Sequence, residues 1–154
     1  IYQNNDTIKN KSLALIEGRK RLYKLFSFCK ENIEGFKNSY ISEIANSLGV
    51  RVSNMIEGEY IYTKDDMISS KRFKNEVLES EYPIDIHDKN STIEPKNTTY
   101  FLPIESIKSK DIKNLYVVGR CLSADFEAQS ALRVQISAFQ TGEAASMDIV
   151  KNLT

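Results

Sequence analysis

The chain has 154 residues, 41% of them hydrophobic, which is enough for a folded body with its own core. Lysine plus arginine and aspartate plus glutamate both total 21, so no overall charge favours nucleic acid or an anionic membrane surface. No apolar run approaches the roughly 18 residues of a membrane span, and the first residues lack the apolar core of a signal peptide. We therefore expect a cytoplasmic protein that neither spans a membrane nor binds nucleic acid.

The cysteines argue against a metal site and against a disulfide framework. Cys29 and Cys121 lie far apart, and neither belongs to a CxxC pair or has a histidine at metal-ligand spacing. The chain begins with Ile1 rather than methionine, so we expect a processed chain or a piece of a longer one.

The N-terminal third predicts two helices. Over residues 15–33, apolar positions recur at about helical spacing between lysines and arginines, which is typical of a long amphipathic helix. Apolar residues at i, i+3, i+4 and i+7 predict a second helix over 41–48, with Ser39 as its N-cap and Gly49 after its end. We expect the two helices to form a hairpin within residues 8–49.

Residues 50–104 carry the signals of a small β region. Apolar residues alternate over 50–62, with a break at Glu57 and Gly58, which predicts a β-hairpin. The stretches "YPIDIH", residues 82–87, and "YFLP", residues 100–103, each predict a short strand, and the proline favours an edge strand or a strand start for the first.

Two further local signals stand near this region. Thr63 and Asp66 have the spacing of a capping box, which predicts a short helix after Thr63. Residues 104–114 are typical of a turn or a short helix.

Residues 115–118, "LYVV", form a continuous apolar run, which predicts a strand covered on both faces in a parallel sheet. Gly119 would end this strand with a sharp turn or a close approach of the backbone to a ligand.

The remainder, residues 125–152, predicts one long helix with a face of small residues. We expect that face to pack closely on its neighbour, with Leu132, Ile136 and Phe139 on an adjacent core-facing strip. Strand, glycine and helix predict a ligand-facing α/β junction, although the same pattern forms plain core in many α/β proteins. The fold class is thus predicted as α+β. The small residues are Ala124, Ala128, Ala131, Ala138, Gly142 and Ala145.

Three segments in order, "GEYIYTKDD", "YPIDIH" and "LYVVGRCLSADFEAQSALRV", resemble the C-terminal portion of a family of FAD-dependent oxidoreductases. The flavin-binding architecture of that family is similar to that of glutathione reductase and of the fumarate reductase and succinate dehydrogenase flavoproteins. The resemblance runs from about Leu13 onward. It implies an enzyme that transfers a hydride or an electron pair between an unknown organic substrate and FAD.

The resemblance also implies which residues meet the cofactor. Gly119 and Arg120 would lie beside the ribityl and diphosphate part of FAD. A following segment would bring backbone amides and a helix N-terminus toward the isoalloxazine, where positive potential stabilises the reduced flavin. That segment consists of Ser130, Ala131, Leu132, Arg133, Val134 and Gln135.

Four residues are candidates for catalysis or substrate binding. His87 is the one histidine, and it shares a strand face with Asp85, which could orient its ring for proton transfer. A solvent-facing histidine is the alternative. Arg51 is a candidate clamp for a carboxylate or else half of a structural ion pair, and Tyr100 is the tyrosine we expect to reach substrate.

The family's N-terminal GxGxxG turn is missing from these residues, since the six glycines are scattered. Residues 1–154 are therefore predicted to be a C-terminal fragment, with 50–104 on the substrate side and 105–154 completing the FAD-binding domain. Its partner would be the missing N-terminal portion. We expect the fragment alone to be inactive and to bind FAD weakly or not at all. The alternative is a non-catalytic binding or interaction domain.

Overall fold

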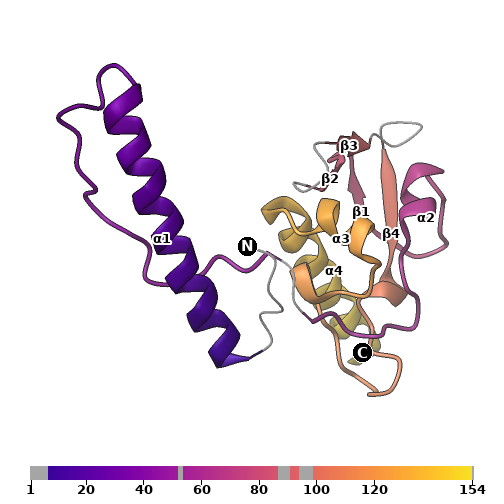
Figure 1. Cartoon of the computed structure of the whole chain (residues 1–154). Helices are drawn as coiled ribbons and strands as arrows, with labels where there is room; N and C mark the ends of the chain where they lie inside the picture. The colour runs from indigo at the N-terminus through magenta and orange to yellow at the C-terminus, as the bar shows by residue number, and fades with distance from the viewer. Residues whose placement is uncertain (1–6, 52–53, 87–90, 94–98, 154) are drawn as a thin grey trace. The chain divides into compact units, whose positions relative to one another are not determined.

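The computed structural model describes residues 7–51, 54–86, 91–93 and 99–153 (Figure 1). The chain divides into two compact units, Ile1–Ser53 and Asn54–Thr154, and each is described by itself. Helices and small antiparallel sheets together make an α+β fold, as the sequence predicts. No helix among the described residues is long and apolar enough to cross a membrane.

The first unit contains one long helix, α1, Ile8–Asn32. Thr7 caps it, since its side chain accepts a hydrogen bond from Asn10 N at 3.2 Å. The predicted second helix over 41–48 is wrong, because residues 33–51 contain no helix or strand. The hydroxyl of Ser39 donates to the carbonyl of Phe36, three residues earlier, at 2.6 Å, so it does not act as the predicted N-cap. A helix this short is marginal without a tertiary contact to stabilise it, and the predicted helical hairpin does not form.

The second unit contains two small antiparallel sheets. β1, Glu76–Ser80, pairs with β4, Tyr100–Pro103, and β2, Ile84–Ile86, pairs with β3, Ser91–Ile93. The strands predicted from "YPIDIH" and "YFLP" are confirmed as far as the structure describes them. Pro83 directly precedes β2, in keeping with a strand start.

The β-hairpin predicted over residues 50–62 is wrong. The described part of this stretch, 50–51 and 54–62, forms single bridges instead, from Gly58 to Ser109 and from Tyr62 to Ala124. The amide of Tyr62 donates to the Ser123 carbonyl at 3.1 Å. The backbone groups of this stretch therefore pair with residues far along the chain rather than with each other, which local alternation does not reveal.

The capping box is confirmed in α2, Lys64–Ile68, where Thr63 and Asp66 exchange hydrogen bonds. Asp66 is buried, and its Oδ2 accepts from the Tyr60 hydroxyl at 2.7 Å and from Thr63 Oγ1 at 2.9 Å. Its Oδ1 lies 2.8 Å from Lys71 Nζ. One carboxylate thus joins α2 to the chain before and after it.

Asp66→Asn is expected to lower the free energy of unfolding by about 2 kcal/mol at neutral pH, because hydrogen bonds to a charged acceptor are lost. Burial alone would raise the pKa of Asp66, but hydrogen bonds from Lys71, Tyr60 and Thr63 hold that pKa below its ordinary value. The native protein therefore gains stability above about pH 4 and loses it as the pH falls through the lowered pKa. Urea unfolding between pH 2 and pH 7 measures this effect. If the free energy of unfolding of the variant changed with pH as steeply as that of the parent, the prediction would be contradicted.

The chain after β4 departs from the predicted strand. The short helix η1, Ile104–Ser106, agrees with the expected turn. Residues 115–118 do not form a strand in a parallel sheet: Tyr116 makes one antiparallel bridge with Lys108, while Leu115 and Val118 are 38% and 37% exposed. The described residues offer this stretch no neighbouring parallel strand, so its apolar side chains are only partly covered.

The predicted long helix is broken into α3, Phe126–Leu132, and α4, Gln135–Leu153. The break changes the axis, so residues at helical spacing on either side of it no longer share one face. Ile136 and Phe139 are accordingly 63% and 76% exposed, and their placement on a core-facing strip is wrong. Leu132 on α3 is buried as expected. The core contains Tyr62, Met67, Leu78, Ile84, Tyr100, Leu102, Ile104, Ile107, Leu122, Ala124, Ala128, Ala131, Leu132 and Ala145.

Candidate functional site

A glycine turn packs against the two C-terminal helices. It forms the short helix η2, Gly119–Cys121, which contacts both α3 and α4. Gly119 is buried with φ +67°, a conformation that side-chain-bearing residues rarely adopt, and its amide donates to Thr141 Oγ1 at 3.2 Å. Gln129 Nε2 donates to the Arg120 carbonyl at 3.0 Å. The turn is thereby held by one side chain from each helix.

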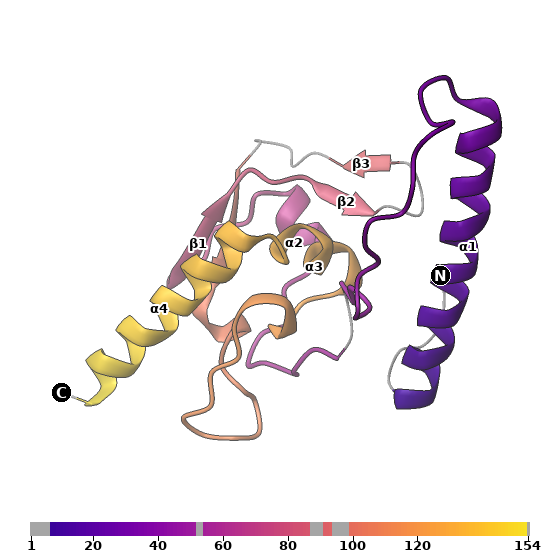
Figure 2. The same ribbon diagram turned by 90° about the vertical axis from the view of Figure 1, so that its left-hand side faces the viewer.

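The start of α3 is anchored by Asp125. One carboxylate oxygen accepts from Ala128 N at 2.7 Å, which caps the helix, and the other accepts from Lys64 N at 2.7 Å, at the start of α2. A single side chain therefore satisfies amides at the N-termini of two helices. This ties the start of α3 to the start of α2, and α3 also contacts β2 (Figure 2).

The junction between α3 and α4 consists of Arg133 and Val134. Arg133 is half-buried, and its Nε donates to the Ser130 carbonyl at 3.1 Å. A second guanidinium nitrogen reaches the backbone carbonyl of Asp85 on β2 at 3.4 Å. The side chain of Arg133 therefore joins the end of α3 to the strand that carries a predicted catalytic residue.

The N-terminus of α4 differs from those of the three preceding α-helices. Thr7, Thr63 and Asp125 each accept a hydrogen bond from a first-turn amide of their helix. Val134, which precedes α4, has no polar side chain and cannot do so. First-turn amides have no partner within their own helix and carry a partial positive charge. The start of α4, which follows Arg133 and Val134 in the sequence, therefore has the polarity that suits an anionic group.

The predicted cofactor residues lie on elements that contact one another. Gly119 and Arg120 lie in η2, the segment 130–135 spans the end of α3 and the start of α4, and η2 contacts both helices. Ser130, Ala131 and Leu132 are buried, whereas Gln135 is exposed. The side chains of Ala131 and Leu132 are buried in the core, so these residues could contact a cofactor only through their main-chain atoms.

The predicted catalytic pair is described in part. Asp85 lies on β2, opposite Thr92 of β3. His87 lies outside the described residues, so the pairing of His87 with Asp85 stays a prediction. The contact between α3 and β2, with the hydrogen bond from Arg133 to the Asp85 carbonyl, brings this strand and the predicted cofactor segment together.

The two predicted substrate residues lie on other elements of the chain. Tyr100, on β4, has no exposed surface, and burial raises the pKa of its hydroxyl to about 12. A contact between Tyr100 and substrate would require the surrounding side chains to move. Arg51 is exposed and belongs to the first unit. Among the described residues, no group of three or more His, Cys, Asp or Glu side chains could hold a metal ion.

Two residues of the junction were not predicted from the sequence. Thr141 holds the amide of Gly119, and Gln129 holds the carbonyl of Arg120. The first contact joins residues 22 positions apart, and the second joins residues 9 positions apart. Thr141 lies one position before the small residue Gly142 on α4, a pattern that indicates close packing but not which backbone group it would bind.

Glycine turns and helix N-termini are the elements with which α/β enzymes bind the anionic groups of nucleotide cofactors, and both are present here. The chain matches the family model described as FAD dependent oxidoreductase over residues 2–150, and it belongs to that family. This confirms the resemblance to FAD-dependent oxidoreductases and indicates FAD-linked redox chemistry with a small-molecule substrate as the general function. Comparisons with curated proteins and with solved structures gave no match.

Proposed function

We propose that this chain forms the C-terminal part of an oxidoreductase that transfers a hydride or an electron pair between an organic substrate and FAD. The observation that carries the proposal is the start of α4, where Val134 offers the first-turn amides no side-chain cap and Arg133 stands one residue earlier. An uncapped, positively polarised helix end is where the negative groups of a flavin cofactor would be stabilised.

The residues at the junction fit FAD. When bound, FAD supplies the redox chemistry, and the chain's residues supply position and charge. Gly119 and Arg120 would hold its ribityl and diphosphate part, and the amides of Val134 and Gln135 with Arg133 would face the isoalloxazine. Two buried polar atoms at the junction lack a hydrogen-bond partner among the described residues, Gln129 Oε1 and Ser137 Oγ. Such atoms are costly when left unpaired, which also favours an additional group at this place.

The proposal includes a second portion of protein outside these residues. The sequence lacks the GxGxxG turn that binds the cofactor's diphosphate in such enzymes. In addition, Leu115 and Val118 are more than one-third exposed in a run that should be covered on both faces in a flavin domain. We infer that the missing portion would cover residues 115–118 and complete the site, with residues 105–154 as its C-terminal part.

Residues 50–104 would then provide the substrate side. Asp85 would orient His87 for proton transfer, because an imidazole near neutral pH can both accept and donate a proton. The bond from Arg133 to the Asp85 carbonyl supports this, since it ties the strand to the proposed cofactor segment. Arg51 and Tyr100 remain the proposed substrate contacts. A cytoplasmic location is part of the same proposal.

The isolated chain is expected to bind FAD weakly or not at all, because half of the diphosphate-binding surface is missing. Titration of FAD with the chain, followed by flavin fluorescence, checks this. The control is FAD alone, diluted in the same steps. Tight, stoichiometric binding by the isolated 154-residue chain would contradict the proposal that a second portion is needed.

A further inference from the structure

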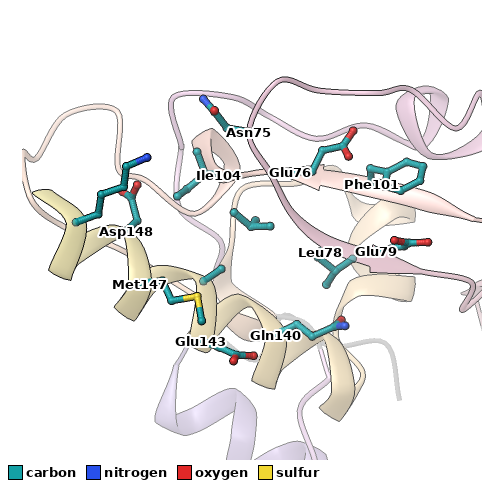
Figure 3. A pocket seen from close by; sticks show the side chains of 13 residues that line it. Asn75, Glu76, Leu78, Glu79, Phe101, Ile104, Gln140, Glu143, Met147 and Asp148 are labelled. Carbon is teal, nitrogen blue, oxygen red and sulfur yellow. The ribbon is translucent and has the colours of Figure 1, made fainter.

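A groove of about 710 Å³ lies between β1 and α4, away from the cofactor junction (Figure 3). One wall is formed by five consecutive residues, 75–79, with Phe101 and Ile104 beside them. The other wall is one face of α4, with the spacing i, i+3, i+4, i+7, i+8 and i+11. Its residues are Gln140, Glu143, Ala144, Met147, Asp148 and Lys151.

The strand wall is an edge rather than a face of the sheet. Successive side chains of a strand point to opposite faces, so five consecutive residues that line one groove indicate that the main chain itself lines it. β1 has β4 as the other strand of its two-stranded sheet, and alternate N–H and C=O groups of β1 point away from β4. Among the described residues, no group outside this sheet forms a hydrogen bond with the backbone of 77–79.

Charge gives the groove a preference for one kind of occupant. Glu76 is held by Arg72 at 2.8 Å, and Asp148 is held by Lys108 at 2.7 Å. Glu79 on β1 and Glu143 on α4 are exposed, and neither forms an ion pair among the described residues. Lys151, the cation among the lining residues, acts on Asp148, where after the hydrogen bond from Lys108 its charge helps to hold the pKa of that carboxyl below its ordinary value. Glu79 and Glu143, labelled in Figure 3, therefore remain as carboxylates without an ion pair on opposite walls.

The groove also has an apolar part. Leu78 points toward α4 in Figure 3, and Met147, which is 64% exposed, lies on the facing helix. Oε1 of Gln140 is buried without a hydrogen-bond partner among the described residues. An added strand would bring backbone donors, apolar side chains and solvent-facing side chains in alternation, which suits this mixture of groups.

We propose that the groove binds an extended, lysine- or arginine-bearing segment of a partner protein, which adds as a strand to the free edge of β1. Main-chain hydrogen bonds to β1 provide affinity, and a cationic side chain between Glu79 and Glu143 selects basic segments over acidic ones. This interaction is independent of the proposed cofactor site, because neither wall contains residues 119–135.

A labelled peptide tests the proposal. The probe is a fluorescein-labelled octapeptide of alternating lysine and valine, titrated with the full chain and followed by fluorescence anisotropy. We expect saturable binding, binding at least about tenfold weaker for the matching glutamate–valine peptide, and loss of binding when the valine amides are N-methylated. Amide NMR shifts should be confined to residues 75–79 and to the groove face of α4.

Charge reversal locates the site. Glu79→Lys with Glu143→Lys should weaken binding of the basic peptide by at least about tenfold. The matched control, Glu59→Lys with Asp111→Lys, makes the same change in net charge at exposed positions outside the groove and should leave the affinity within about twofold. Circular dichroism of both variants checks that they are folded.

Three results would overturn the proposal. Equal affinity for the acidic peptide would show that charge does not select the occupant, and equal effects of the two charge-reversal variants would place binding elsewhere. A concentration-dependent dimer that the peptide dissociates would show that a second copy of the chain occupies the groove.

Discussion

Gly58→Ala is expected to lower the free energy of unfolding by about 3 kcal/mol, at the upper end of what overpacking costs. A Cβ at this position would lie 2.7 Å from Ser123 Cβ and 3.0 Å from the Glu105 carbonyl oxygen. A third close atom is the carbonyl oxygen of Lys108, at 3.1 Å. Two of the three are backbone atoms, so the strain cannot be relieved by rotating a flexible side chain. Gly58 also bridges Ser109, and the clash would disturb that pairing.

Chemical denaturation of the isolated chain measures this effect, and Gly142→Ala is the matched control. A Cβ at Gly142, within α4, would meet nothing within 4 Å, and alanine is favoured over glycine inside a helix by about 0.5–1 kcal/mol. The two variants should therefore change stability in opposite directions. A Gly58→Ala chain as stable as the parent would show that residues 105–109 and 123 do not enclose Gly58 as described.

Arg133→Ala is expected to weaken FAD binding by about a hundredfold in the extended polypeptide that contains the proposed second portion. Truncating a charged group that contacts an anion costs about 2–5 kcal/mol, and a hundredfold change corresponds to about 2.7 kcal/mol. Arg133→Lys keeps the charge but loses the planar donors that reach the Ser130 and Asp85 carbonyls, so we expect an intermediate affinity.

Flavin fluorescence titration measures these affinities, and thermal unfolding of the FAD-free variants separates loss of binding from loss of folding. Arg72→Ala is the control, because Arg72 is an exposed cation paired with Glu76 and is not part of the junction. Unchanged FAD affinity in a folded Arg133→Ala variant would remove Arg133 from the proposed site.

The local elements of the fold are predictable where a short sequence signal determines them. The spacing of apolar residues predicts α1, and the capping box at Thr63 and Asp66 predicts α2. The strand β4 follows from its apolar and aromatic residues and the proline at its end. In each of these elements the determining groups lie within a few residues of one another.

The predictions of secondary structure are wrong where residues far apart in the sequence determine the structure. The stretch 54–62 alternates like a hairpin but bonds to residues near 105–123, and no local pattern shows those partners. The predicted helix over 41–48 has helical spacing, yet it lacks the packing that a short helix needs. The break at Arg133 and Val134 has neither glycine nor proline to mark it, although it creates the helix N-terminus on which the site depends.

The candidate site stays a prediction, although its residues lie on neighbouring elements. The resemblance implied Gly119, Arg120 and the segment 130–135, and the structure places them on η2, α3 and α4, with η2 in contact with both helices. It did not identify Thr141 or the bond from Arg133 to Asp85, which spans 48 positions of the sequence. Family motifs mark residues near a ligand, whereas the contacts that hold those residues in place depend on the folded chain.

The most direct test of the central claim is the flavin content of the extended polypeptide. We predict that this longer protein, with a GxGxxG turn upstream of the present residues, purifies yellow or takes up one equivalent of added FAD, as measured by the visible absorbance of the bound flavin. An extended protein that carries the turn, remains colourless and takes up no FAD would contradict the account.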